Sequence, residues 1–142
     1  PRSIAAICQV GCILPFFDRC IGFPPSDKAI FENGKAIRGG VPVVWPQFGP
    51  GQLPQHGFAR VKAWQLGDKS IGDDVTVQLH LSEDESTLKI WPHKFHLTVT
   101  VRLSGQTLHQ ELAVKNTDDH PFDFTALFHT YFTVDDIKKT KV

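Results

Sequence analysis

The clearest feature of the sequence is an alternation of apolar and polar residues in its second half. Residues 95–103 place Phe, Leu, Val, Val and Leu on one parity and polar residues on the other. Residues 75–81 show the same period, and residues 108–114 resume it after the turn signal Ser104-Gly105. A period of two is typical of a half-buried strand, so these segments predict consecutive antiparallel strands.

A short helix is expected between the first two of these strands. Ser82 and Glu85 have the spacing of a capping box, and Asp84 would lie in the first turn. Pro92 would end the helix. The pattern predicts a helix from about Glu83 to Trp91.

A further strand is predicted over residues 122–134, after a polar loop at 116–120. Its phenylalanines at 122, 124, 128 and 132 share one parity, while His129 and Tyr131 share the other. This register predicts mostly buried phenylalanines and places His129 and Tyr131 in a groove. Hairpin-linked strands with almost no helix predict an all-β fold, an antiparallel sandwich or barrel.

Composition restricts the classes of function. The chain has 142 residues, 41% of them hydrophobic, which suits about one domain with a real core. Fifteen Lys and Arg residues balance fifteen Asp and Glu residues. A neutral chain offers no broad basic face, so we do not expect nucleic acid as a partner.

The cysteines and the apolar runs bear on location. Cys8, Cys12 and Cys20 form no CxxC pair, so neither a disulfide framework nor a zinc site is expected. This favours a reducing, cytoplasmic setting. No apolar run reaches the ~20 residues of a membrane span, so no membrane association is expected.

The segment from Ala36 to Arg60 carries the most chemistry. It combines Arg38, Gln47, Gln55, His56 and Arg60 with many prolines and glycines. Such a segment is a loop, and rigid loops often hold binding residues. Guanidinium, imidazole and amide groups suit an anionic, hydroxyl-rich ligand. The alternative is a structured surface loop with scattered charges.

Two histidines are candidates for acid–base chemistry. His56 lies in this loop and His129 on the polar face of the last strand, and imidazole titrates near neutral pH. Either could instead be a hydrogen-bonded structural residue. Asp135 could bind hydroxyl groups or belong to a plain turn. His93 and His96 lack a Cys or carboxylate partner nearby, so no metal is expected.

Three blocks of the sequence together resemble one family. KAIRGGVPVVWPQFGPGQLPQHGFAR (35–60), LKIWPHKF (88–95) and PFDFTALFHTYFTVDDI (121–137) are similar to the glucose-6-phosphate 1-epimerases. These hexose-6-phosphate mutarotases belong to the aldose 1-epimerase superfamily and include relatives of the plant apospory-associated protein C. The resemblance runs from about Lys28 to the end and implies a β-sandwich of the galactose mutarotase type, incomplete at the C-terminus.

The resemblance also implies an activity and roles for single residues. The family interconverts α and β anomers of hexose 6-phosphates by acid–base ring opening, with no cofactor. By this resemblance His129 would be the acid at the ring oxygen, and His56 would bind and polarise the anomeric region. Arg38 and Arg60 would contact the phosphate, and Gln55 and Asp135 would hold hydroxyl groups.

The chain departs from the family pattern in two ways. Family members are about twice as long, and no residue here matches their C-terminal catalytic glutamate, so the chain looks like a fragment. Residues 1–25 look unmatched, which leaves 26–142 as a partial sandwich domain. The hypotheses are a mutarotase that is monomeric when full length, a non-catalytic carbohydrate-phosphate binding module, and an inactive truncated product.

Overall fold

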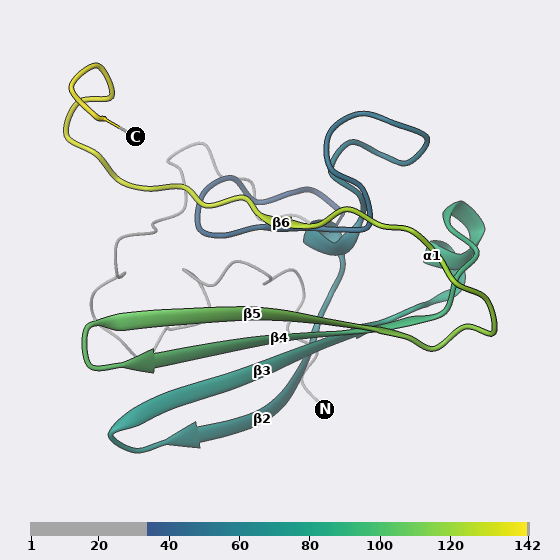
Figure 1. Ribbon diagram of the computed structural model, residues 1–142, viewed down its shortest axis with the longest axis horizontal. Coiled ribbons are helices and arrows are strands. Elements are labelled where there is room, and N and C mark those ends of the chain that lie inside the picture. Colours follow the sequence, from purple (N-terminus) through teal and green to yellow (C-terminus); the bar gives the residue numbers. More distant parts are fainter. Residues whose placement is uncertain (1–33, 142) are drawn as a thin grey trace.

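The computed structural model describes residues 34–141 of the chain. Its main layer is a four-stranded antiparallel sheet in the order β2-β3-β4-β5, with one helix, α1, between β3 and β4 (Figure 1). The bounds of these elements are β2 Gln65–Ile71, β3 Asp74–Ser82, α1 Glu85–Ile90, β4 Phe95–Ser104 and β5 Thr107–Asn116. The expected boundary near residue 25 lies outside the described residues.

A second layer lies across one face of this sheet (Figure 1). It contains the short antiparallel pair β1 Val43–Val44 and β6 Leu127–Phe128, and the 3-10 turn η2 Ala59–Val61. Backbone hydrogen bonds lengthen the pair at both ends: the N–H groups of Thr125, His129 and Tyr131 donate to the carbonyls of Pro46, Pro42 and Gly40. The antiparallel all-β fold expected from the sequence is therefore observed.

The core fills the space between the two layers. The alternating residues of β4, from Phe95 to Val101, are buried, as predicted. Trp45 contributes the largest side chain from the second layer, and its ring lies 4.5 Å from Phe95 and 4.9 Å from Trp91. Burial of such large aromatic surfaces is the main term that holds the layers together.

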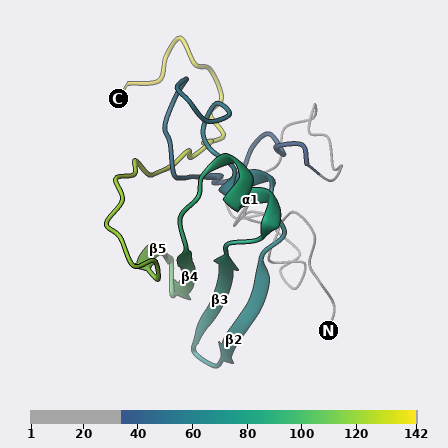
Figure 2. The same ribbon diagram turned by 90° about the vertical axis from the view of Figure 1, so that its right-hand side faces the viewer.

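Helix α1 forms at one end of the sheet (Figure 2), where the sequence predicted it. The capping residue is different from the expected Ser82. Asp84 is the N-cap: its carboxylate accepts hydrogen bonds from the backbone N–H groups of Ser86 and Thr87, and the Thr87 hydroxyl accepts one from the N–H of Asp84. Glu83 instead accepts from the N–H of Phe95 and joins the helix entry to β4.

The prediction of a long strand at 122–134 was wrong, since only Leu127–Phe128 pairs as a strand. Phe122 and Phe128 are half-buried and pack on the core. Phe124 and Phe132 are 43% and 71% exposed, so the prediction that these two are mostly buried was also wrong. Among the described residues, the apolar face of this segment is therefore only partly covered, whereas the alternation in the sequence predicted a fully buried face.

Candidate functional site

The loop after β1 folds around the side chain of Gln47. Its amide nitrogen donates to the carbonyls of Gly49 and Leu53 at 3.2 and 3.1 Å, and its oxygen accepts from the N–H of Leu53 at 3.1 Å. Gly51 lies against the same amide, where a Cβ would come within 2.4 Å of its oxygen. Gln47 therefore gives a Pro/Gly-rich loop a fixed shape without regular secondary structure.

The loop closes where Trp45 pairs with Gly57. The Trp45 carbonyl accepts from the N–H groups of Phe58 and Ala59, and the peptide bond to Pro46 is cis. Gly57 has φ +67°, and a Cβ there would lie 2.1 Å from the Trp45 carbonyl oxygen. Only glycine fits this position, which holds the residue before it, His56, next to the core.

His56 has an unusual backbone and two contacts to one residue. Its φ is +66°, a value rarely adopted by residues other than glycine. Its N–H donates to the Gly49 carbonyl at 3.1 Å, and its ring Nδ1 accepts from the Gly49 N–H at 3.1 Å. Backbone held in this region is often found at functional sites.

The second layer brings His129 to His56. The Phe48 N–H donates to the Thr125 hydroxyl at 2.7 Å, which ties the loop to the final strand. The strand then continues past β1 and places the His129 ring 5.6 Å from the His56 ring, edge to face. The two histidines singled out from the sequence thus lie together.

Two further aromatic rings extend this pair. Phe48 stacks on His56 at 5.4 Å, and Tyr131 stacks on His129 at 5.0 Å. We call Phe48, His56, Arg60, His129 and Tyr131 the histidine cluster. Stacked neighbours limit the orientations open to each imidazole, which favours acid–base chemistry.

Arg60 supplies the positive charge of the cluster. Its Nη2 donates to the Gln55 carbonyl at 2.9 Å, while its Nε is buried and has no partner among the described residues. Burial lowers the pKa of Arg60, and Tyr131 acts in the opposite direction. A buried donor without a partner costs free energy.

The environment keeps His56 neutral. Partial burial, Arg60 and the neighbouring His129 all lower the pKa of His56 from its usual value. Because each of these effects disfavours the imidazolium, the neutral ring dominates at physiological pH. Its Nδ1 accepts a hydrogen bond from the backbone, so the ring hydrogen lies on Nε2.

The other residues singled out from the sequence lie outside this cluster. Arg38, Gln55 and Asp135 are exposed. Arg38 is two residues before Gly40, whose carbonyl accepts from the Tyr131 N–H at 2.9 Å. The Gln55 carbonyl accepts from Arg60, but within residues 34–141 none of the three side chains forms a hydrogen bond or ion pair with His56 or His129.

The roles of two residues of the site, Phe48 and Gln47, could not be derived from the sequence pattern. Phe48 stands in a Pro/Gly-rich run that gives no strand period, and the role of Gln47 depends on contacts within the folded loop. Tyr131 could be placed on the His129 face by parity alone. In the part of the chain that the structure describes, no group of three His, Cys, Asp or Glu residues could hold a metal ion.

Comparison with known proteins identifies the family of this chain. The aldose 1-epimerase family matches residues 17–142. The chain belongs to the aldose 1-epimerase family. No helix among residues 34–141 is long and apolar enough to cross a membrane.

Several members of this family are similar along most of the chain. A protein of Cenchrus ciliaris, named as a candidate glucose-6-phosphate 1-epimerase, is 44% identical over 82% of this chain and 39% of its own length. One of Escherichia coli K12 with the same name is 43% identical over 82% of this chain and 40% of its own length. The chain therefore spans about two fifths of these relatives.

Solved structures agree on the fold. A candidate mutarotase from Salmonella typhimurium superposes with a TM-score of 0.73 at 38% identity, over 81% of this chain and 39% of that one. Slr1438 of Synechocystis has a TM-score of 0.72 at 28% identity, over 78% of this chain and 43% of that one. The fold is thus the mutarotase-type β-sandwich, of which this chain is an incomplete part.

Proposed function

We propose that this chain is the histidine-bearing part of a glucose-6-phosphate 1-epimerase, which interconverts the α and β anomers of hexose 6-phosphates. The observation that carries the proposal is the His56–His129 pair, 5.6 Å apart and next to Arg60. Family membership and the names of the relatives support the same activity.

In the proposed reaction His129 is the acid. It gives a proton to the ring oxygen as the bond between that oxygen and the anomeric carbon breaks, while a base removes the proton of the anomeric hydroxyl. The resulting aldehyde rotates, and the ring closes on either face by the reverse steps. General acid–base catalysis of this kind contributes roughly 10²–10⁴-fold.

His56 has a binding and polarising role in this proposal. As a neutral imidazole with its hydrogen on Nε2, it donates a hydrogen bond to the anomeric oxygen, where negative charge develops. Phe48 stacks on this ring and limits its movement. His56 has no free lone pair in this state, so it does not act as the base.

Arg60 and Arg38 would bind the phosphate. The Arg60 guanidinium is the group best placed for this role, because it lies beside His56 and a guanidinium binds a phosphate oxygen through charge-assisted hydrogen bonds. Arg38 precedes the segment that pairs with Tyr131. Gln55 and Asp135 would hold sugar hydroxyls from exposed positions in the same part of the chain.

A non-catalytic sugar-phosphate binding module is the second candidate. The observation that favours it is electrostatic: the groups that shift the pKa of His56 are Arg60 and His129, and no carboxylate of residues 34–141 is among them. A module with these residues would bind a hexose 6-phosphate and lack the base for ring opening. The cytoplasmic location, the monomeric state and the lack of nucleic-acid partners stay predictions.

Anomer exchange of glucose 6-phosphate, followed by NMR, tests the proposal. We expect the reading frame extended to the length of the relatives to accelerate exchange, and His129→Ala in that protein to abolish the acceleration. Binding without acceleration, even in the extended protein, would support the binding module. Absence of both would refute the shared site.

A further inference from the structure

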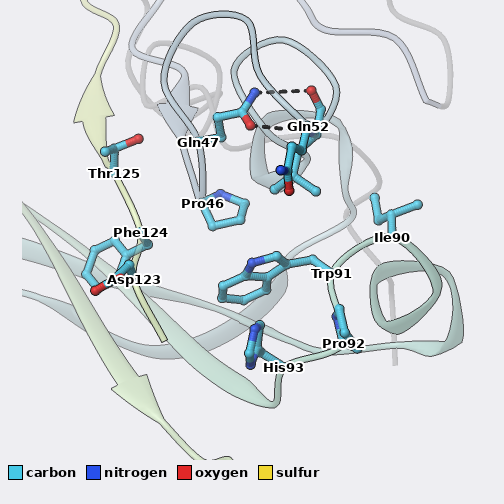
Figure 3. A pocket seen from close by; sticks show the side chains of 11 residues that line it. Pro46, Gln47, Gln52, Ile90, Trp91, Pro92, His93, Asp123, Phe124 and Thr125 are labelled. Atoms are coloured by element: carbon cyan, nitrogen blue, oxygen red, sulfur yellow. Dashed lines mark hydrogen bonds between the residues drawn. The ribbon is translucent and has the colours of Figure 1, made fainter. Parts of the chain in front are cut away.

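A pocket lies outside the histidine cluster. It has a volume of about 660 Å³ and opens between the loop of Gln47, the segment after α1 and the residues before β6 (Figure 3). Its lining residues are Pro46, Gln47, Gln52, Leu53, Ile90, Trp91, Pro92, His93, Asp123, Phe124 and Thr125. None belongs to the histidine cluster, and the volume is within the usual range for small-molecule sites.

The lining combines an aromatic centre with a polar rim. Figure 3 shows Trp91 at the centre, with Gln47 and Gln52 on one side, Asp123 and Thr125 on another, and His93 opposite the glutamines. The side chains of Gln52 and Asp123 make no hydrogen bond within the described residues, so both can bind a ligand. The face of a tryptophan suits the C–H face of a sugar ring, and the amide and carboxylate suit its hydroxyls.

The charge of the lining separates this pocket from the histidine cluster. It contains no Lys or Arg, and Asp123 supplies a negative group. A phosphate would meet no Lys or Arg here and would be repelled by Asp123. A neutral, hydroxyl-rich ligand meets no such penalty.

Contacts within the protein hold the walls of the pocket. Trp91 is held by ring contacts with Trp45, His93 and Phe122 at 4.9, 4.6 and 4.8 Å. Gln47 holds the opposite wall through its bonds to Gly49 and Leu53. A preformed site spends little binding free energy on ordering its side chains.

We infer that the Trp91 pocket binds a neutral sugar unit, separately from the hexose 6-phosphate proposed for the histidine cluster. The two sites share the loop that Gln47 organises, because Gln52 and Leu53 line the pocket and His56 ends the loop. A ligand in the pocket therefore contacts the segment that positions His56.

The test is an NMR titration of the isotope-labelled 142-residue chain with methyl β-D-glucopyranoside, which is neutral and cannot mutarotate. We expect saturable shifts at the Trp91 indole N–H and the Gln52 side-chain amide. Gln52→Ala should weaken binding at least fivefold. Gln106→Ala, at an exposed glutamine in the β4–β5 turn, is the matched control and should leave binding unchanged.

Two further variants keep the outcomes distinct. Asp123→Asn preserves shape and should also weaken binding, while Arg60→Ala should leave methyl glucoside binding intact even if it removes glucose 6-phosphate binding. Spectra of each variant with wild-type dispersion verify folding. The inference is overturned by an absence of saturation, by shifts centred on His56 and His129, or by equal effects of Gln52→Ala and Gln106→Ala.

Discussion

The backbone N–H of Gly49 donates a 3.1 Å hydrogen bond to Nδ1 of His56, and the N–H of His56 donates in return to the Gly49 carbonyl at 3.1 Å. A backbone N–H can only donate, so Nδ1 must keep its lone pair. The neutral imidazole then carries its hydrogen on Nε2. This one contact within the loop therefore leaves His56 with a hydrogen-bond donor at Nε2 for a ligand and with no nitrogen free to act as a base.

This relationship predicts the titration of His56. Long-range ¹H–¹⁵N NMR at about pH 8 should show an unprotonated Nδ1, with a pKa below the usual value of about 6.5. Below that value the unfolded chain binds the proton more readily than the folded chain. Stability should therefore fall as the pH decreases through about 6.5, and His56→Gln should reduce this fall. A protonated Nδ1 in the neutral ring would contradict the assignment.

Arg60 is expected to distinguish a sugar phosphate from a free sugar. Arg60→Ala should weaken binding of glucose 6-phosphate by about 1.5–3 kcal/mol, roughly tenfold to a hundredfold, because a charge-assisted contact is lost. Glucose should lose much less affinity in the same calorimetric or NMR titration. Arg102→Ala is the matched control, since Arg102 is an exposed arginine paired with Asp74 on the sheet. Equal losses for both sugars would show that Arg60 does not contact the phosphate.

The fold was predictable wherever burial alternates along one strand. β3, β4 and β5 follow the pattern because one face of each packs on the core. β2 was missed, since six of its seven residues are exposed and no apolar period remains to find. The expected strand at 122–134 was wrong because alternation shows which face is apolar, and does not show whether a partner strand covers it.

The site was predictable only in part. His56 and His129 could be singled out by residue type and by resemblance, but their closeness depends on pairing between segments about 85 residues apart in sequence, such as Val43 with Phe128. The positive φ of His56 and the bonds of Gln47 come from the folded loop. Such features do not recur at regular sequence positions, so they leave no pattern in the sequence.

Gly57 should be the least replaceable glycine of the loop. Gly57→Ala places a Cβ 2.1 Å from the Trp45 carbonyl oxygen and also strains the backbone at φ +67°. We expect a loss of about 3 kcal/mol or more in urea unfolding. Gly105→Ala is the control, because its φ is +55° but nothing lies within 4 Å of the added Cβ. It should cost only the backbone term of about 1–2 kcal/mol, and equal losses would contradict the proposed clash.

Asp84 should stabilise both α1 and the contact of this helix with the segment before β2. Its carboxylate caps the helix through Ser86 and Thr87 and pairs with Lys62 at 2.8 Å. Although burial acts in the opposite direction, the bonds from Lys62 and Ser86 lower its pKa strongly. Asp84→Ala should cost about 0.5–2 kcal/mol in thermal unfolding. Asp119→Ala, at an exposed loop aspartate whose side chain has no recorded partner, should cost less.

The last prediction concerns catalysis by the 142-residue chain itself. Ring opening needs an acid at the ring oxygen and a base at the anomeric hydroxyl. His129 can supply the acid, but Nδ1 of His56 is occupied by the Gly49 N–H and Nε2 carries the hydrogen, so His56 cannot supply the base. We expect the base to be the C-terminal glutamate that the resemblance implies, for which this chain offers no counterpart.

We therefore expect this chain to bind glucose 6-phosphate yet leave its mutarotation close to the rate in buffer, while the extended reading frame accelerates it. Polarimetry or NMR of the approach to anomeric equilibrium measures both rates. The matched variant is His56→Gln in the extended protein. Its side-chain amide keeps a donor, so it should retain more activity than His56→Ala. Full activity of the 142-residue chain would refute the assigned base, and equal loss in both His56 variants would refute the donor role of Nε2.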